Sequence, residues 1–134
     1  MKNKDNEYIR KCYKVKVDKI REYLINNLED NVTNAQLSEK FDITMTLMKK
    51  CFKCMNGIPI NAFIRNEKMK LAADLLKNTK HSVTEIAGKV GYNNSSKFSA
   101  AFKNITGMSP IEYRKSDVRL EHLRLNGVEE KNRD

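Results

Sequence analysis

Two cysteines lie three positions apart in the first half of the chain, and a pair at this spacing can bind a metal ion or take part in redox chemistry. They are Cys51 and Cys54. A zinc site needs a second pair of ligands, and the other candidates, Cys12, His81 and His122, are distant in the sequence. We therefore expect no metal ion and no other cofactor. The odd total of three cysteines also argues against a disulfide framework.

The residue patterns of common enzyme sites are missing from the sequence. It contains no evident pair of catalytic carboxylates, no Ser/His/Asp set and no glycine-rich phosphate loop. His81 precedes an expected helix cap and His122 lies in a charged tail, so neither histidine has an evident partner. We expect that the protein is not an enzyme, and detectable turnover of any substrate would contradict this expectation.

A different chemistry, the reading of DNA bases, is open to polar residues on the outer side of two expected helices. Lysine can donate hydrogen bonds to guanine O6 and N7, and threonine can bond to a base or pack against the methyl group of thymine. In the first of these helices the outward residues are Thr46, Lys49 and Lys50. An equally weighted alternative is that both lysines contact only phosphates, as lysine often does.

The charge of the chain also favours an anionic partner. Its 134 residues include 26 Lys and Arg against 17 Asp and Glu, which gives a net charge of +9 and an isoelectric point near 9.5. Such a balance indicates nucleic acid first and a membrane surface second, although a lysine-rich surface without any target would give the same total. No acidic residue occurs in 43–66 or in 86–111, and each window contains one of the two outward-facing helices.

The elements that position these residues can be read first in the segment 82–113, which predicts a helix, a turn and a second helix. Ser82-x-x-Glu85 has the form of a capping box, which starts a helix. Gly91 can adopt a positive φ in the turn, and Asn94 can cap the next helix. Apolar residues recur at helical spacing on the inner side, at Ile86, Ala87, Val90, Phe98, Ala101 and Phe102.

A second copy of this unit lies about fifty residues earlier in the chain. In the segment 33–57, T-x-x-Q-L corresponds to the later S-x-x-E-I, and the pattern F-K-x-x-x-G occurs in both copies. Thr44 is expected to cap the second helix of this copy. Between the copies, an apolar stripe without interior Gly or Pro predicts a stiff connecting helix from about Pro59 to Lys77. A stiff helix would fix the separation of the two units.

Two further helices are expected outside the repeat. Apolar residues from Val17 to Leu28 predict an amphipathic helix of about three turns that ends near Asn31. A capping signal at Ser109 predicts a short final helix.

At these residues the chain resembles the AraC/XylS family of bacterial transcription regulators. The positions that match the family's C-terminal signature are Ala72, Leu75, Leu76, Ser82, Val83, Glu85, Ile86, Ala87, Val90, Gly91, Tyr92, Phe98, Ser99, Phe102, Lys103, Gly107, Ser109, Pro110, Tyr113 and Arg114. The resemblance implies an all-α, homeodomain-like fold of about seven helices, in which two helix-turn-helix subdomains are joined by a long connecting helix. Family members usually carry a separate sensing or dimerisation domain before this one, and nothing here resembles it.

We accordingly divide the chain into five regions. They are a basic lead-in or linker (1–15), a first helix-turn-helix subdomain (16–57), a connecting helix (58–78), a second helix-turn-helix subdomain (79–116) and a charged tail that is expected to fray (117–134). A further alternative for the lead-in is a basic arm that adds phosphate contacts.

The resemblance and the helix geometry together select the candidate site residues. The base-reading candidates are Thr46, Lys49 and Lys50 in the first unit and Ser95, Ser96 and Lys97 in the second. Family members often carry Arg where this chain has Ala100, so we expect the second unit to read bases less strongly. The phosphate-contacting candidates are Thr33, Thr44, Ser82 and Asn94 at helix N-termini, together with Lys53 and Lys103. For the residues at N-termini, helix capping alone is the alternative role.

These expectations define a sequence-specific regulator of transcription that binds double-stranded DNA. Two recognition helices would enter successive major grooves, about 34 Å apart, of an asymmetric site, which a monomer can do. The family resemblance favours an activator and leaves RNA polymerase as a further candidate partner. The alternative is a helix-turn-helix protein-interaction module, or a repressor with little base-specific binding.

A role at a membrane surface ranks last, because the sequence contains no Trp and the expected helices already need their apolar stripes for a core. No apolar run approaches the length that spans a bilayer, and the chain does not open with a signal-peptide pattern. The expected location is the cytoplasm.

Overall fold

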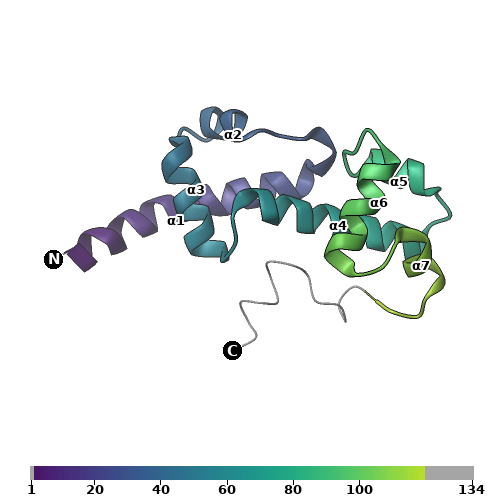
Figure 1. Cartoon of the computed structure of the whole chain (residues 1–134). Helices are drawn as coiled ribbons and strands as arrows, with labels where there is room; N and C mark the ends of the chain where they lie inside the picture. Colours follow the sequence, from purple (N-terminus) through teal and green to yellow (C-terminus); the bar gives the residue numbers. More distant parts are fainter. Residues whose placement is uncertain (1, 120–134) are drawn as a thin grey trace.

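The computed structural model describes the backbone of residues 2–119 and the side chains of residues 13–119, and the regular secondary structure in this range is entirely helical (Figure 1). The elements are α1 (Lys2–Asn26), the short 3-10 helix η1 (Leu28–Asp30), α2 (Asn34–Lys40), α3 (Met45–Asn56), α4 (Ile60–Asn78), α5 (Val83–Lys89), α6 (Ser95–Thr106) and α7 (Pro110–Lys115). The prediction of an all-α fold with about seven helices is confirmed. Residues 120–134, which make up most of the expected tail, lie outside the described residues.

The first helix is longer than the apolar spacing predicted. α1 begins at Lys2 and ends at Asn26, whereas the sequence pattern predicted about three turns starting near Val17. Most of the expected lead-in is therefore part of this helix. The reason is that no Gly or Pro interrupts the first 26 residues, and a helix that has started gains one hydrogen bond for each residue it adds. α1 also ends at Asn26, before the expected stop at Asn31, which instead ends η1 in the left-handed conformation with a φ of 53°.

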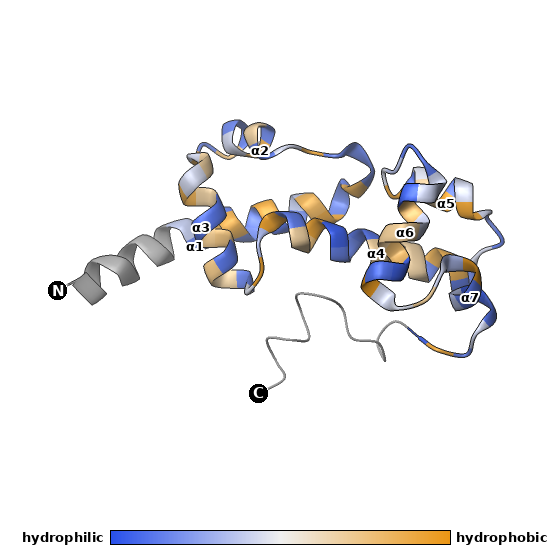
Figure 2. Ribbon diagram, viewed as in Figure 1, coloured by the Kyte–Doolittle hydropathy of each residue, from blue (hydrophilic) through white to orange (hydrophobic). Residues whose placement is uncertain are grey.

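Two hydrophobic cores form, one toward each end of the described structure. In the first, α1–α3 and the start of α4 bury Val17, Ile20, Leu24, Leu37, Ile43, Met48, Phe52, Ile58, Ile60 and Phe63. In the second, the rest of α4 packs against α5–α7 and buries Met69, Ala72, Ala73, Leu76, Ile86, Ala87, Val90, Phe98, Phe102, Ile105 and Tyr113. Figure 2 shows apolar residues concentrated where α4 passes α1 and again where it passes α6. We call α1–α3 the first unit and α5–α7 the second unit, with α4 as the connecting helix.

Side-chain caps start the short helices at the residues that the sequence predicted. For α2, Thr33 Oγ1 accepts a hydrogen bond from the backbone N–H of Gln36 at 3.1 Å, and the Gln36 side chain accepts one from the Thr33 N–H at 2.9 Å. The same reciprocal pair joins Ser82 and Glu85 at the start of α5, at 3.0 and 2.8 Å. Since α2 and α5 have only seven residues each, such caps and the packing against α3, α4 and α6 must hold them in helical form.

The end of the connecting helix is fastened to α7 by Arg114. Its Nε donates to the carbonyl of Leu76 at 2.9 Å, and one terminal nitrogen donates to the carbonyls of Thr79 and His81 at 3.2 and 2.7 Å. The last carbonyls of a helix lack partners within the helix and carry partial negative charge. Arg114 therefore satisfies the C-terminal end of α4 and the segment that follows it.

Candidate nucleic-acid interface

The outer side of α3 presents the three base-reading candidates of the first unit to solvent. Thr46, Lys49 and Lys50 are exposed, whereas Met48 and Phe52 on the opposite side of the helix are completely buried. The two buried side chains anchor α3 on the first core. The three polar residues are therefore available to a partner without any rearrangement of the core.

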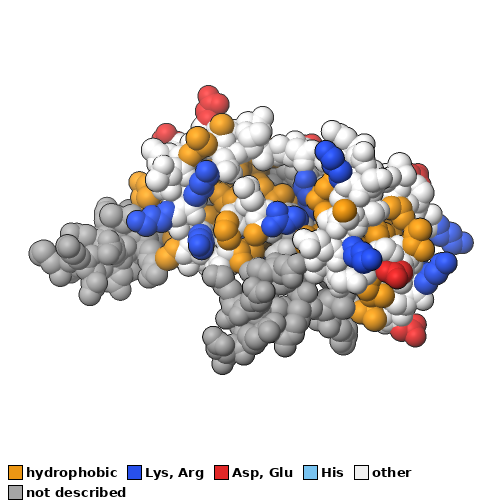
Figure 3. Space-filling model, in the orientation of Figure 1, with side chains coloured by type: hydrophobic (Ala, Val, Ile, Leu, Met, Phe, Trp, Pro, Cys, Tyr) orange, Lys and Arg blue, Asp and Glu red, His pale blue; other side chains and the backbone are white. Residues whose placement is uncertain are grey.

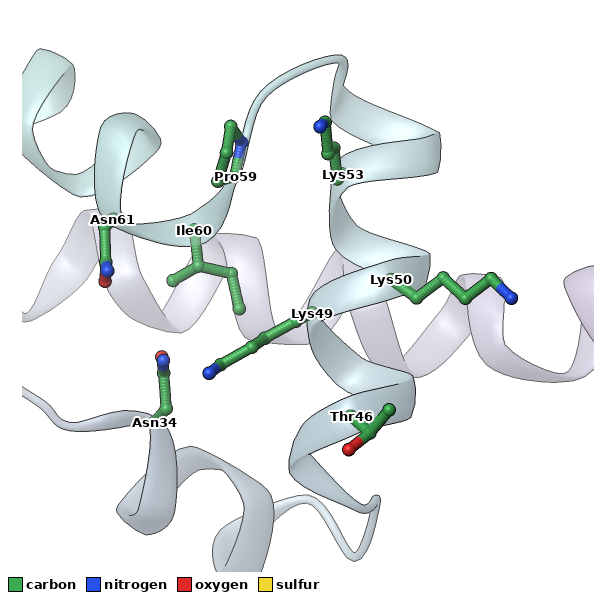
Figure 4. Close-up of a pocket in the computed structure, with 8 residues that line it drawn as sticks. All are labelled: Asn34, Thr46, Lys49, Lys50, Lys53, Pro59, Ile60 and Asn61. Atoms are coloured by element: carbon green, nitrogen blue, oxygen red, sulfur yellow. The ribbon is translucent and has the colours of Figure 1, made fainter.

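A groove of about 470 Å³ lies between α3 and the N-terminal ends of α2 and α4. It is lined by Asn34, Thr46, Lys49, Lys50, Lys53, Pro59, Ile60 and Asn61. Figure 4 shows that the Lys49 ammonium points across this groove toward Asn34 and Asn61, whereas the end of the Lys50 side chain points away from these two residues. The two lysines, adjacent in sequence, thus serve different parts of the surface.

The groove is electropositive for two reasons. Three of its lining residues are lysines and none is acidic. In addition, the N-terminus of the 19-residue helix α4 reaches it, and the free backbone N–H groups and dipole of a helix N-terminus favour an anion. Figure 3 shows Lys and Arg side chains spread over this face of the molecule, with acidic side chains mostly toward its edges.

The second unit presents α6 in the same manner but with less charge. Asn94 starts the helix, since its Oδ1 accepts hydrogen bonds from the backbone N–H groups of Ser96 at 2.7 Å and Lys97 at 3.1 Å. Ser96, Lys97 and Ala100 are exposed, and Ser95 is half-buried. Near its start, the outer side of α6 therefore offers one cation, Lys97, and short hydroxyls, in contrast to the two lysines and the threonine in the first turns of α3.

The remaining candidates were expected to contact phosphates. Four of them act as caps in the structure: Thr33, Thr44, Ser82 and Asn94 each accept a hydrogen bond from the first turn of the helix that they start. The hydroxyls of Thr33, Thr44 and Ser82 still have an O–H to donate, and Asn94 still has its amide N–H groups, so capping leaves all four able to bind a phosphate. Lys53 and Lys103 are exposed in the last turns of α3 and α6.

Asn34 and Asn61 also line this groove, although the sequence patterns did not predict them as site residues. Both lie in the first turn of a helix, which is a weak local signal for a polar surface position. Only the packing of α2 and α4 beside α3 brings them to the groove that Lys49 enters. Their amide groups can donate to a phosphate or to a base edge.

Cys51 is half-buried on α3, and burial raises the pKa of its thiol, which disfavours the thiolate that binds metals. Among residues whose side chains are described, no three His, Cys, Asp or Glu residues gather into a group that could hold a metal ion. Within the same part of the chain, no helix has the length and apolar character needed to cross a membrane.

Two outward-facing helices, each carried by a capped helix-turn-helix unit, define the chain as a double helix-turn-helix domain. A family model described as a helix-turn-helix domain matches residues 37–116. The C-terminal domain of AraT, a response regulator from Geobacillus stearothermophilus, is 30% identical with a TM-score of 0.72, over 75% of this chain and 84% of that one. The chain belongs to the AraC-type family of helix-turn-helix domains, so the predicted AraC/XylS resemblance is confirmed.

Other relatives agree in sequence or in fold. The Msm operon regulatory protein of Streptococcus mutans is 29% identical over 102 residues, which cover 76% of this chain and 37% of that protein. The transcriptional activator RhaR of Yersinia pseudotuberculosis is 29% identical over 85 residues, which cover 63% of this chain and 29% of RhaR. The chain thus spans about a third of the length of these curated relatives. The DNA-binding domain of AdpA, solved with a target DNA, shares the fold with a TM-score of 0.70 at 19% identity, over 73% of this chain and 88% of that one.

Proposed function

We propose that this chain binds double-stranded DNA in a sequence-specific manner and regulates transcription, with α3 and α6 as its two recognition helices. The observation that supports the proposal most directly is that both helices turn small or basic side chains outward while their apolar sides form two cores on one connecting helix. A helix of this kind fits the major groove of B-DNA, where its outward residues meet base edges.

The first unit carries most of the base reading in this proposal. Lys49 and Lys50 are extended donors that can reach guanine O6 and N7, and Thr46 can pack against a thymine methyl. Because Lys49 points into the groove beside Asn34 and Asn61, it can bind a base edge and a neighbouring phosphate from one position. The end of Lys50 points away from Asn34 and Asn61, so Lys50 has a different target on the duplex in this proposal.

In this proposal the second unit contributes fewer base contacts than the first and serves mainly to bind the phosphate backbone of the DNA. Ser96 and Lys97 are the exposed donors near the start of α6, Ser95 is half-buried, and Ala100 offers only a methyl group. The capping residues Thr33, Thr44, Ser82 and Asn94, together with Lys53 and Lys103, are placed to hold phosphates and fix the register of the domain on DNA.

One chain with two recognition helices calls for an asymmetric site rather than a palindrome, because a palindrome reflects two-fold symmetry of the protein. Binding by a monomer, activation rather than repression, contact with RNA polymerase and a cytoplasmic location belong to the proposal as well. The names of the relatives, a transcriptional activator and an operon regulator, support the regulatory role.

Selection of binding sites from random duplex DNA at two salt concentrations tests the proposal. We expect one asymmetric motif of two half-sites, and binding that weakens steeply with salt because phosphate contacts release counterions. Replacing Lys49 or Lys50 by Ala should relax one half-site at a loss of about 1–3 kcal/mol per base contact. Lys70→Ala, which removes an exposed lysine of α4 paired with Glu67 at 3.1 Å, is the control and should leave the motif unchanged.

Absence of any enriched motif, combined with binding that does not respond to salt, would refute the proposal. It would favour a protein-interaction module of the same fold, for which Ala100 and the serines at 95 and 96 on α6 give some support. Enrichment of one half-site alone would assign base reading to α3 and leave α6 as a clamp on the backbone.

A further inference from the structure

A polar junction joins three segments that are far apart in the sequence. Asn31 lies between η1 and α2, Lys68 lies in the middle of α4, and Gly91 lies in the turn between α5 and α6. The Asn31 Nδ2 donates to the carbonyl of Gly91 at 2.8 Å, and its Oδ1 accepts from the Lys68 Nζ at 2.5 Å. One side chain of the first unit is thereby bonded to both the connecting helix and the second unit.

The lysine of this junction is unusual because it is buried without an acidic partner. Lys68 is only 8% exposed, and no carboxylate forms an ion pair with it among the residues whose side chains are described. Its Nζ lies 5.3 Å from the centre of the Tyr92 ring in the adjoining turn. Burial lowers the pKa of Lys68, as expected for a charge removed from water. A side chain that only filled this space would be apolar, so the ammonium indicates a position at which its hydrogen bond to Asn31 matters.

The third member, Gly91, lets the turn of the second unit come close enough for the junction to form. Its φ is +88°, which other residues rarely adopt. A Cβ placed on Gly91 would lie 2.9 Å from Asn31 Oδ1, 3.0 Å from the carbonyl of Leu28 and 3.1 Å from Lys68 Nζ. A side chain at this position would therefore displace the Asn31 and Lys68 side-chain ends from each other and crowd the Leu28 carbonyl, in addition to straining the backbone.

We propose that the junction of Asn31, Lys68 and Gly91 is a positioning element, which fixes the orientation of the second unit relative to the first and so sets the half-site spacing that the chain accepts. A single helix such as α4 can curve along its length, and this would change the angle between units joined by it alone. The junction adds a second connection between the two units, beside α4, and so restricts the angle between them. The role of the junction in half-site spacing rests on the proposed DNA binding, whereas its role in the orientation of the two units does not.

Two substitutions open the junction with little disturbance elsewhere. Asn31→Gly removes both hydrogen bonds, and glycine keeps the backbone φ of 53° accessible. Asp42→Gly is its matched control, because Asp42 is exposed, has a φ of 52° and lies outside the junction. Lys68→Met keeps the aliphatic stem but removes the ammonium, and Lys70→Met changes an exposed lysine of the same helix as its control.

Residual dipolar couplings of the free 134-residue protein test the orientation without DNA. In the native protein and in both controls, the helices of the two units should fit one common alignment tensor. In Asn31→Gly and Lys68→Met, each unit should fit its own tensor while its internal couplings remain those of the folded unit. If both variants retain one common tensor, the junction does not hold the orientation and the proposal is overturned.

Affinity for duplexes in which the two selected half-sites are moved apart or together by one base pair tests the spacing. The native protein should prefer one spacing, and Asn31→Gly should reduce this preference by about threefold to tenfold, the effect of one net hydrogen bond. Affinity for an isolated half-site should not change. Separate tensors with an unchanged spacing preference would overturn the link to spacing. Failure to select any two-part site would count against the proposed function, and the couplings would still decide whether the junction fixes the orientation.

Discussion

Replacing Arg114 by methionine should weaken the second unit far more than the first. The guanidinium donates to the carbonyls of Leu76, Thr79 and His81, which lie at or just beyond the end of α4. A hydrogen bond from a charged group to a partner contributes about 1.5–3 kcal/mol. Arg114 is only half-buried, and methionine keeps most of its aliphatic stem, so we assign the three hydrogen bonds together the free energy of about one such bond. The free energy of unfolding of the second unit should therefore fall by about 2 kcal/mol.

Native-state hydrogen exchange measures this loss for each unit separately. Amides of α5–α7 should lose protection by about thirtyfold, the equivalent of 2 kcal/mol, while amides of α1–α3 should change much less. Lys115→Met, which alters an exposed neighbour on α7, should change neither set. A loss below about 0.5 kcal/mol, the range of ordinary surface substitutions, would show that Arg114 does not stabilise the end of α4. An equal loss in both units would also contradict the prediction, because the bonds would then not be specific to the second one.

Three further predictions concern stability and can be checked by urea unfolding. Gly91→Ala should destabilise the protein by at least about 1–2 kcal/mol because of its positive φ and close neighbours, whereas Gly88→Ala, at a helical position with open space around it, should stabilise it by about 0.5–1 kcal/mol. Phe102→Ala, at a completely buried ring that packs on other aromatic rings, should lower the free energy of unfolding by about 3–5 kcal/mol, and an unchanged midpoint would contradict the second core. Hydrogen bonds from the backbone N–H groups of the helix caps lower the pKa values of Glu85 and Glu112 in the folded protein. The two carboxylates therefore stabilise the fold at neutral pH, and this stabilisation is lost as the pH falls from about 4.3, the pKa of an unfolded Glu, through the lowered folded values. The double variant Glu85→Gln/Glu112→Gln should flatten this acid dependence, and an identical pH profile would refute that cause.

The features that the sequence predicted well are those fixed by residues a few positions apart. The capping boxes at Thr33 and Ser82 depend on a partner three residues later, and both occur in the structure. Gly91 takes the positive φ that the turn required. The outward direction of Thr46, Lys49 and Lys50 followed from helical spacing alone, and all three are exposed.

Contacts between distant segments could not be predicted in this way. Asn31 and Gly91 are sixty residues apart, and no local pattern pairs a residue that ends a 3-10 helix with a turn in another unit. Lys68 interrupts the apolar stripe of the connecting helix, and a lysine there is expected to be exposed, yet it is buried. Asn34 and Asn61 join the site of Lys49 only through the packing of three helices. The extent of α1 was also missed, because apolar spacing reports the buried part of a helix and not its exposed continuation.

The division of α4 between two cores has a consequence for the order in which the chain can fold during synthesis. The first core is closed by Ile60 and Phe63, near the start of α4, so every residue that it needs precedes Met69. The second core waits for Tyr113, about fifty residues later. Since synthesis adds about 5–20 residues per second, the first unit has several seconds in which to form before the second can close. The nascent connecting helix would then be anchored at its N-terminal end and would present an apolar stripe, on which the second unit assembles.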